Sequence, residues 1–283
     1  MKALEALFHT LDTQPEIPLD GSILFLHALA HPALEAWRGR LTCEQVWKPA
    51  ALRLQHSGIP STREAAGTFD AVLLLPERQR DTVLADFAKA HDLLNEGGTL
   101  VVALHNDWGA KRMEQQLASV AGELQTVSKS HCRVFWAKKH PGWKTAQLAQ
   151  WRQNAAMRRI LDGRFWSMPG LFHWDAIDEG SALLVEHLPR DLRGAVADLG
   201  AGWGFLSQHL LHHCPDIRSL DMYEADSRAL ECARRNTGLI PVPVRPKLHW
   251  HDVTQGLGGA MYDTVVMNPP FHDGRDADPR LGA

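Results

Sequence analysis

Cysteine, tyrosine and net charge are all scarce in this chain of 283 residues. Its four cysteines lie far apart and form no C-x-x-C pair, so reduced thiols fit better than a disulfide framework or a zinc site. The formal net charge of −3 argues against a protein that coats nucleic acid indiscriminately. No apolar run approaches the ~18 residues needed to cross a bilayer, and the first residues do not read as a signal peptide. We therefore expect a cytoplasmic protein without a membrane partner.

The stretch at residues 262–271, YDTVVMNPPF, is the most informative part of the chain. Residues 264–267 are apolar or β-branched and predict a short buried strand. Because proline cannot donate to a sheet ladder, the two prolines that follow end this strand. An amide, free carbonyl oxygens and an aromatic ring then stand at the carboxyl end of a strand, where open α/β sheets bind ligands. An ordinary proline loop is the alternative. The candidate catalytic residues are Asn268, Pro269, Pro270 and Phe271.

A glycine-rich turn precedes this strand in the chain. Residues 196–199 predict a strand, residues 200–204 read G-x-G-x-G, and a helix is expected over residues 205–214. Glycines let the backbone approach a ligand closely, and a helix N-terminus offers free N–H groups. A second strand, over residues 220–223, is followed by Glu224, whose carboxylate suits the two hydroxyls of a ribose. The spacing differs from the G-x-G-x-x-G of nicotinamide enzymes, which disfavours a nicotinamide site.

A third strand, over residues 247–250, precedes Asp252 and Val253, where an adenine ring would lie with the acid accepting from its amine. The glycine turn, the two acids and Asn-Pro-Pro-Phe follow one another in this order. In that order they resemble the motifs of S-adenosylmethionine-dependent methyltransferases that modify planar amino groups. The resemblance implies S-adenosylmethionine as the cofactor. The expected cofactor-binding residues are Asp198, Gly200, Ala201, Gly202, Gly204, Glu224, Ala225, Asp252, Val253 and Asn268.

Residues 165–188, FWSMPGLFHWDAIDEGSALLVEHL, and the final motif NPPFHDG narrow the resemblance. They are similar to the bacterial small-subunit ribosomal RNA guanine-N2 methyltransferase C family and to its large-subunit relative, the guanine-N2 enzyme G. That family implies methyl transfer to the exocyclic N2 amine of a guanine, with ribosomal RNA or the small ribosomal subunit as the partner. Asn268 Oδ1 and the Pro269 carbonyl would accept from the amine, and Phe271 would stack on the base, with no general base required. Amino groups of DNA adenine or cytosine and a protein glutamine amide are rival targets.

An internal repeat accounts for the length of the chain. FDAVLLLPE at residues 69–77 aligns with YDTVVMNPP at residues 262–270. In the first copy Leu75 replaces the asparagine, and residues 1–60 hold no glycine-rich turn between a strand and a helix. We therefore predict an α/β protein with two tandem Rossmann-like methyltransferase domains. The first is a degenerate domain at residues 1–140 without a cofactor motif, and the second is an S-adenosylmethionine-binding catalytic domain at residues 165–283. A basic linker helix at residues 141–164 is expected to connect them.

The second copy is shorter than the first at its carboxyl end. Fourteen residues follow Pro269, whereas the first copy continues for 63 residues from Pro76 to Lys139. We expect a truncated chain whose second sheet is incomplete and whose methyltransferase activity is weak or absent. A non-catalytic RNA-binding module is then the alternative function.

Basic residues gather around the expected linker. Between residues 129 and 164 there are nine Lys or Arg and one acid, a local charge of +8 that leaves −11 for the rest of the chain. Tryptophans are interleaved with them, and such a strip can hold phosphates and stack bases. A solvated helix docked by its tryptophans explains the same pattern. The RNA-binding candidates are Lys138, Lys139, Arg152, Arg158, Arg159 and Arg164.

Three further expectations concern single features. His209 and His213 are four residues apart on a helix, but no third ligand accompanies them, so we predict no metal site. Trp203, a bulky residue inside the glycine turn, is expected to alter how the methionine end of the cofactor is held. Helices are also expected over residues 31–40 and 143–161, a strand over residues 44–47, and a glycine helix cap at residues 95–98.

Overall fold

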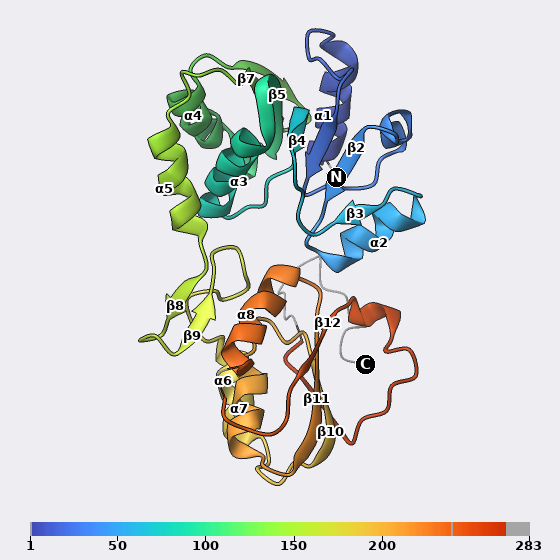
Figure 1. Ribbon diagram of the computed structural model, residues 1–283, viewed down its shortest axis with the longest axis vertical. Coiled ribbons are helices and arrows are strands. Elements are labelled where there is room, and N and C mark those ends of the chain that lie inside the picture. Colours follow the sequence, from blue (N-terminus) through green and yellow to red (C-terminus); the bar gives the residue numbers. More distant parts are fainter. Residues whose placement is uncertain (1, 239, 270–283) are drawn as a thin grey trace. The chain divides into compact units, whose positions relative to one another are not determined.

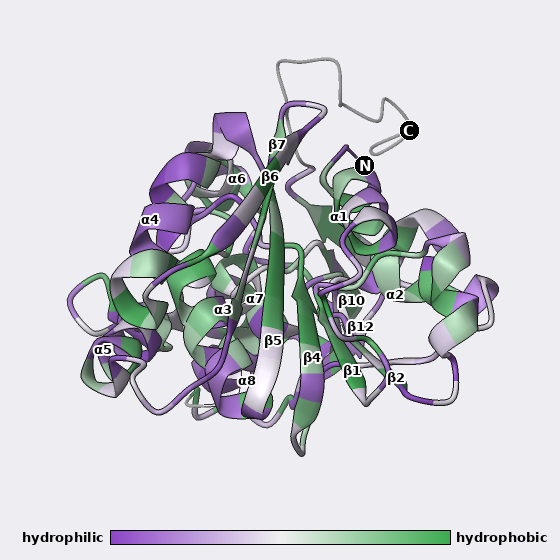
Figure 2. Cartoon of the chain, turned by 90° about the horizontal axis from the view of Figure 1, so that it is seen from above, coloured by the Kyte–Doolittle hydropathy of each residue, from purple (hydrophilic) through white to green (hydrophobic). Residues whose placement is uncertain are grey.

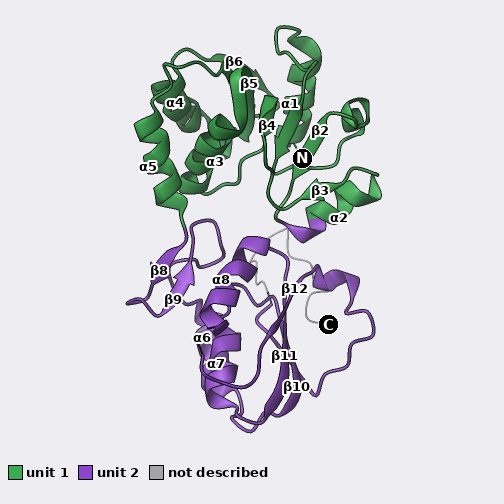
Figure 3. Cartoon of the chain, in the orientation of Figure 1, with its two compact units in different colours: residues 1–46, 50–156 green, residues 47–49, 157–283 purple. Residues whose placement is uncertain are grey.

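The computed structural model describes residues 2–238 and 240–269. The chain divides into two compact units (Figure 3). The first unit contains Met1–Val46 and Ala50–Ala156, and the second contains Trp47–Pro49 and Met157–Ala283. The division after Ala156 differs from the boundaries that the sequence suggested at residues 140 and 164.

The first unit is built on a seven-stranded sheet (Figure 1). Its strands are β1 (Ile23–Leu26), β2 (Leu41–Glu44), β3 (Ser61–Thr62), β4 (Phe69–Leu74), β5 (Leu94–His105), β6 (Gln125–Lys129) and β7 (Cys132–Lys138). The helices along this part of the chain are α1 (Lys2–Thr13), α2 (Lys48–His56), α3 (Arg80–Leu93), α4 (Ala110–Ala121) and α5 (Thr145–Ala155), with the short 3₁₀ helices η1 (Pro32–Trp37) and η2 (Asn106–Trp108). The strand order is β3-β2-β1-β4-β5-β7-β6, and only the pairs that include β7 are antiparallel.

Two apolar clusters cover the two faces of this sheet. Leu24 and Leu26 of β1 pack with α3, α4 and α5, whereas Ile23 and Phe25 face the other way and pack with α1. This alternation follows from the two-residue period of a strand. A parallel strand buried on both faces needs an apolar residue at nearly every position, which is why β1, β4 and much of β5 are hydrophobic along their length (Figure 2).

The second unit begins with a hairpin and continues as a four-stranded parallel sheet (Figure 1). Its strands are β8 (Arg158–Ile160), β9 (Phe165–Ser167), β10 (Gly194–Leu199), β11 (Ile217–Glu224), β12 (Lys247–Trp250) and β13 (Thr264–Met267). Its helices are α6 (Glu179–His187), α7 (Phe205–His213) and α8 (Ser227–Gly238), with the 3₁₀ helix η3 (Val253–Gln255). The sheet order is β12-β11-β10-β13, and Val196, Met222 and Val266 from three of these strands share one core with α7 and α8.

The two units share a strand arrangement and a local packing device. In each sheet, the first four strands along the chain lie side by side in the order third, second, first and fourth. In the first unit Asp70 accepts a hydrogen bond from the backbone N–H of Ser22 at 2.9 Å, and in the second Asp263 accepts one from Ala195 at 2.8 Å. A Cβ on the preceding glycine, Gly21 or Gly194, would collide with that carboxylate. Glycine is therefore required by close approach in both units, as expected for two copies of one fold.

Several sequence-based assignments are wrong in detail. The helix expected over residues 31–40 is only the 3₁₀ helix η1, and the strand expected over residues 44–47 lies earlier, as β2. Helix α3 ends before the glycines at residues 95–98, because Leu94 already belongs to β5. The linker helix predicted over residues 141–164 is also wrong. Helix α5 ends at Ala155 and packs through Leu148 and Trp151 into the core of the first unit.

The end of the expected linker helix is a β-hairpin instead. Strands β8 and β9 pair antiparallel, with Arg159 opposite Trp166. Leu161, Asp162 and Gly163 take left-handed φ values of +51°, +56° and +81° and form the connecting turn. The Asp-Gly pair reads as a helix stop in sequence, but it serves here as a hairpin turn.

Candidate active site

Four polar segments meet at one edge of the second sheet. Strands β10, β11, β12 and β13 all run parallel, so their carboxyl ends lie at the same edge. Leu199 is paired with Tyr223 on one side and with Met267 on the other. The next residues along the three strands are Gly200, Glu224 and Asn268, which therefore emerge side by side. The structure brings the sequence-predicted segments together; their binding roles stay predictions.

The three glycines of the turn have different structural tasks. Gly200, Gly202 and Gly204 have φ values of +72°, +54° and +91°, which strain any residue with a side chain. A Cβ on Gly204 would lie 3.1 Å from the Ala233 Cα, so this glycine lets α7 begin close against α8. A Cβ on Gly200 or Gly202 would meet nothing within 4 Å. These two glycines border open space, where a ligand can reach the backbone.

Asp198, the last but one residue of β10, is a fully buried acid. It is 0% exposed, and its Oδ2 accepts a hydrogen bond from Ser207 Oγ at 2.6 Å. Its Oδ1 has no hydrogen-bond partner within the described part of the chain. Burial raises the pKa of Asp198 to about 6, the Ser207 hydroxyl opposes this shift, and the nearby Glu224 charge adds to it. A buried carboxylate oxygen without a donor is costly unless a cationic or donor group of a ligand pairs with it.

This burial makes a testable prediction about stability and pH. Because the pKa of about 6 in the folded state lies above that of an exposed acid, the free energy of unfolding falls as pH rises from about 4 to 6. A shift of about two units corresponds to about 3 kcal/mol. Asp198→Asn is expected to remove this pH dependence, measured by urea unfolding at pH 4.5, 5.5 and 7. The exposed Asp216→Asn serves as the control. A wild-type slope in Asp198→Asn would contradict the assignment.

Glu224 closes the glycine turn from the neighbouring strand. Its Oε2 accepts from the Gly202 N–H at 2.8 Å, and its Oε1 accepts from the Asp226 N–H at 2.8 Å. Burial raises the pKa of Glu224, and these two hydrogen bonds oppose the shift. Each carboxylate oxygen has two acceptor positions, so each can accept one further hydrogen bond from a ligand.

Asp252 and Ala225 border the same edge. Asp252 is buried, and its Oδ1 accepts from the Thr254 N–H at 3.1 Å and from Thr254 Oγ1 at 2.6 Å, which caps η3 at Val253. The Ala225 carbonyl accepts from the Trp250 indole at 2.8 Å. The sequence-based prediction did not include Trp250, although this aromatic residue lies between the predicted ligand segments at Ala225 and Asp252.

Asn268 is held by a helix that the sequence did not connect with it. Its Nδ2 donates to Asp178 Oδ2 at 2.7 Å and to Ser181 Oγ at 2.8 Å. No donor among the described residues reaches Asn268 Oδ1. Two of the predicted catalytic residues, Pro270 and Phe271, lie outside the described residues.

The second unit matches a known family of domains. The profile of the methyltransferase small domain family matches residues 162–283. The ribosomal RNA small subunit methyltransferase C of Shewanella loihica is 31% identical over 233 residues, which cover 80% of this chain and 65% of that relative. The protein of the same name from Acinetobacter baylyi is 26% identical, over 79% of this chain and 67% of that relative. The chain is related to the ribosomal RNA small subunit methyltransferase C family.

A solved structure agrees with this relationship at the level of the fold. A T. thermophilus 16S rRNA N2 methyltransferase, in complex with AdoMet and guanosine, matches with a TM-score of 0.73 and 23% identity over 95% of this chain and 75% of that one. The predicted α/β fold with two tandem methyltransferase-like domains is thus confirmed. The chain spans 65% and 60% of the lengths of the Shewanella loihica and Psychromonas ingrahamii relatives.

Trp203 of the glycine turn packs against the hairpin of β8 and β9. Its side chain is 6% exposed and packs edge-on against Phe165 of β9, with ring centroids 5.0 Å apart. Asn236 of α8 fastens the same region, because its Nδ2 donates to the Trp203 and Trp166 carbonyls at 2.7 and 2.9 Å. The Trp203 side chain thus anchors the hairpin of β8 and β9 to the glycine turn, and its effect on the methionine end of the cofactor stays a prediction.

The expected RNA-binding strip is divided between the two units. In the first unit, Arg152 forms a two-pronged ion pair with Asp92, and Lys139 donates to the His91 and Leu94 carbonyls. Both side chains thus have structural partners, whereas Lys138 is exposed. In the second unit, Arg158, Arg159 and Arg164 lie on or beside the hairpin of β8 and β9.

Residues 2–238 and 240–269 contain neither a metal-binding cluster nor a membrane-spanning helix. No group of three or more His, Cys, Asp or Glu side chains is placed there to hold a metal ion. None of the helices in these ranges has the length and apolar character of a membrane span.

Proposed function

We propose that the protein transfers a methyl group from S-adenosylmethionine to the exocyclic N2 amine of a guanine in small-subunit ribosomal RNA. The observation that carries the proposal is the Asn268 amide, held with its oxygen unengaged beside the glycine turn and Glu224. Relatives of the chain are named ribosomal RNA small subunit methyltransferase C, and the T. thermophilus structure is a complex with AdoMet and guanosine.

The residues at the edge of the sheet fit S-adenosylmethionine. The cofactor supplies a methyl group on a sulfonium and carries a second positive charge on its α-amino group. The unpaired Asp198 oxygen suits a cationic group, and the open space at Gly200 and Gly202 admits a ligand to the backbone. Glu224 would accept from the ribose hydroxyls, and Asp252 would accept from the adenine amine, since its Oδ2 has no partner within the described residues.

In this proposal the chain catalyses the reaction by positioning the guanine amine against the methyl group. Asn268 Oδ1 and the Pro269 carbonyl accept hydrogen bonds from the guanine amine and direct its nitrogen lone pair toward the methyl group. Holding two reactants in line supplies most of the rate, because the methyl donor is already activated. Phe271 would stack on the base and Pro270 would stiffen the loop. The nitrogen–methyl bond would form as the sulfur–methyl bond breaks, S-adenosylhomocysteine would leave, and the methylated amine would then lose one proton to water, so no general base is assigned.

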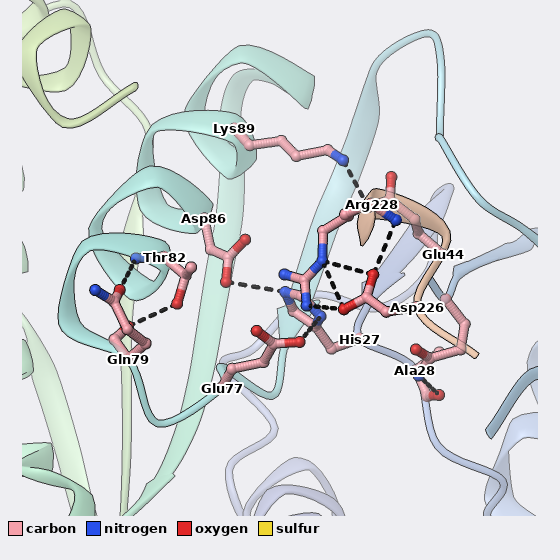
Figure 4. A network of polar contacts seen from close by, with 11 residues as sticks. His27, Ala28, Glu44, Glu77, Gln79, Thr82, Asp86, Lys89, Asp226 and Arg228 are labelled. Carbon is pink, nitrogen blue, oxygen red and sulfur yellow. Dashed lines mark hydrogen bonds and ion pairs between the residues drawn. The ribbon is translucent and has the colours of Figure 1, made fainter. Parts of the chain in front are cut away.

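The first unit does not bind the cofactor in this proposal. The paired registers place His27 where Gly200 lies, Gln45 where Glu224 lies and Leu75 where Asn268 lies. His27 keeps the left-handed φ, +53°, but its ring contacts Asp86 at 2.9 Å and Glu77 at 4.0 Å (Figure 4). At this edge His27 thus contacts acids of its own unit, where the second unit has Gly200. We infer that the first unit supports folding or RNA recognition.

The hairpin of β8 and β9 is the part of the basic strip best suited to RNA. Arg159 and Arg235 both stack on the Trp166 ring, at 4.7 and 5.3 Å, and Arg158 stacks on Trp174 at 5.1 Å. Guanidinium groups bind phosphate, and aromatic rings offer faces on which bases can stack. We propose this hairpin as an RNA contact, and the cytoplasm as the place where protein and ribosomal RNA meet.

The proposal is tested by labelled methyl transfer. The protein is incubated with labelled S-adenosylmethionine and one of three kinds of acceptor. The first is RNA, as 16S rRNA or small subunits lacking the modification, the second is duplex DNA, and the third is a glutamine-containing protein. We expect label in RNA only, recovered as N2-methylguanosine after nuclease digestion. The double variant with Arg158→Gln and Arg159→Gln should raise KM for RNA about 10-fold at unchanged kcat, because phosphate contacts are lost.

Three results would count against this proposal. Label in DNA or in glutamine would replace the substrate with one of its rivals. RNA binding without label, by a protein shown to bind S-adenosylhomocysteine, would favour the non-catalytic RNA-binding module. An unchanged KM in the double variant would remove the hairpin from the RNA contact.

A further inference from the structure

The carboxamide of Asn268 can be oriented in two ways. Its oxygen and nitrogen are nearly equal in size, so hydrogen-bond partners decide which of them faces a substrate. Two partners are present, Asp178 Oδ2 at 2.7 Å and Ser181 Oγ at 2.8 Å, and both lie on the same side of the amide. Ser181 can donate or accept, so the choice rests with Asp178.

Asp178 is held in its charged form. Burial alone would raise its pKa, but hydrogen bonds from the Ser181 N–H and the Asn268 amide, together with His173, hold the pKa below its usual value. A charged carboxylate can only accept hydrogen bonds. The group of Asn268 that faces Asp178 must therefore be the NH₂, which leaves the oxygen at the other position of the amide.

The frame that holds Asp178 is the first turn of α6. Asp178 is the N-cap residue and accepts from the Ser181 N–H at 2.9 Å with the same oxygen that receives Asn268. Gly180 lies between Asp178 and Ser181 in the sequence. A Cβ on Gly180 would lie 3.1 Å from both Asn268 Oδ1 and Asp178 Oδ2. The asparagine is thus packed against a turn in which a methyl group at residue 180 would fit only tightly.

We propose that Asp178 is a positioning residue that turns the Asn268 amide so that its oxygen faces the substrate amine. The inference rests on the proposed function and adds a residue 90 positions away in sequence. A flipped amide would present an N–H group to the N–H groups of the amine, and no hydrogen bond would form. Asp178 thereby acts through Asn268 without touching the substrate.

The test compares Asp178→Ser with Asp178→Asn. Serine keeps an N-cap for α6 but is too short to reach Asn268. Asparagine should put its own oxygen where two N–H donors converge, and so preserve the orientation. We expect kcat for methyl transfer to fall about 10- to 100-fold in Asp178→Ser and by less than about 3-fold in Asp178→Asn. The affinity for S-adenosylhomocysteine should stay unchanged in both.

Gly180→Ala is the variant that separates positioning from folding. Alanine favours a helix, so Tm should not fall, yet its methyl group must push the Asn268 amide by a few tenths of an ångström. We expect kcat to fall with Tm preserved. Glu179→Ser, at the exposed position between Asp178 and Gly180, is the matched control and should keep wild-type kcat.

A second readout keeps this inference separate from the proposed function. The side-chain ¹⁵N–H₂ resonances of Asn268, assigned by their loss in Asn268→Ala, should shift in Asp178→Ser and stay close to wild type in Asp178→Asn. If the wild type methylates RNA and Asp178→Ser does so equally fast, the inference is overturned and the function stands. If the folded wild type methylates nothing, the function fails, and an unshifted amide in Asp178→Ser overturns the inference as well.

Discussion

Asn268→Ala is expected to reduce kcat for RNA methylation by roughly 10²- to 10³-fold, the cost of losing one preorganised hydrogen-bonding group in an enzyme site. The alanine methyl group cannot accept from the guanine amine, so the nitrogen lone pair is no longer directed. Asp178 and Ser181 lose a shared partner, but both are only partly buried, so water can replace it. The measurement is single-turnover labelled methyl transfer with saturating cofactor.

The comparison must separate chemistry from folding. Asn106→Ala makes the same chemical change at an exposed position of the first unit and should leave kcat unchanged. Binding of S-adenosylhomocysteine by Asn268→Ala should stay within about 10-fold of wild type, since the glycine turn and Glu224 supply the other contacts. Wild-type turnover in Asn268→Ala would remove this asparagine from the catalytic site.

The strands of the second sheet were predictable from the sequence, although β10 and β11 begin earlier than expected. Strands β12 and β13 have the bounds that the sequence suggested, since Pro246 precedes one and Pro269 follows the other. In the first unit β2 was misplaced and β3 went unassigned. Those strands have four and two residues, too few to show a period, and their burial comes from neighbours far along the chain.

The candidate site was predictable only where its residues follow a strand. The glycine turn, Glu224, Asp252 and Asn268 each stand at a strand end, and parallel pairing alone gathers them. Asp178 and the hairpin of β8 and β9 depend on contacts across the fold. Asp178 caps α6 and meets Asn268 only because α6 lies beside β13, and Asp162-Gly163 became a turn only because β9 could pair with β8.

Gly202→Asp is expected to abolish cofactor binding while leaving the fold intact. Gly202 has a φ of +54°, a conformation that aspartate enters more readily than most residues, and a Cβ there meets no atom within 4 Å. The new carboxylate would occupy the open space of the turn and place a third acid near Asp198 and Glu224. Calorimetric titration should show a loss of at least about 100-fold in the affinity for S-adenosylhomocysteine.

A matched substitution decides what that loss means. Gly109→Asp has a similar left-handed φ, +78°, and equally open surroundings, but it lies in the first unit, so it should bind S-adenosylhomocysteine as the wild type does. Equal weakening by both substitutions would point to general destabilisation. No binding by the folded wild type would mean that the residues at the edge of the second sheet do not form a cofactor pocket in this chain. Binding that only Gly202→Asp removes would tie the pocket to the glycine turn, because the two variants share the strain and differ only in place.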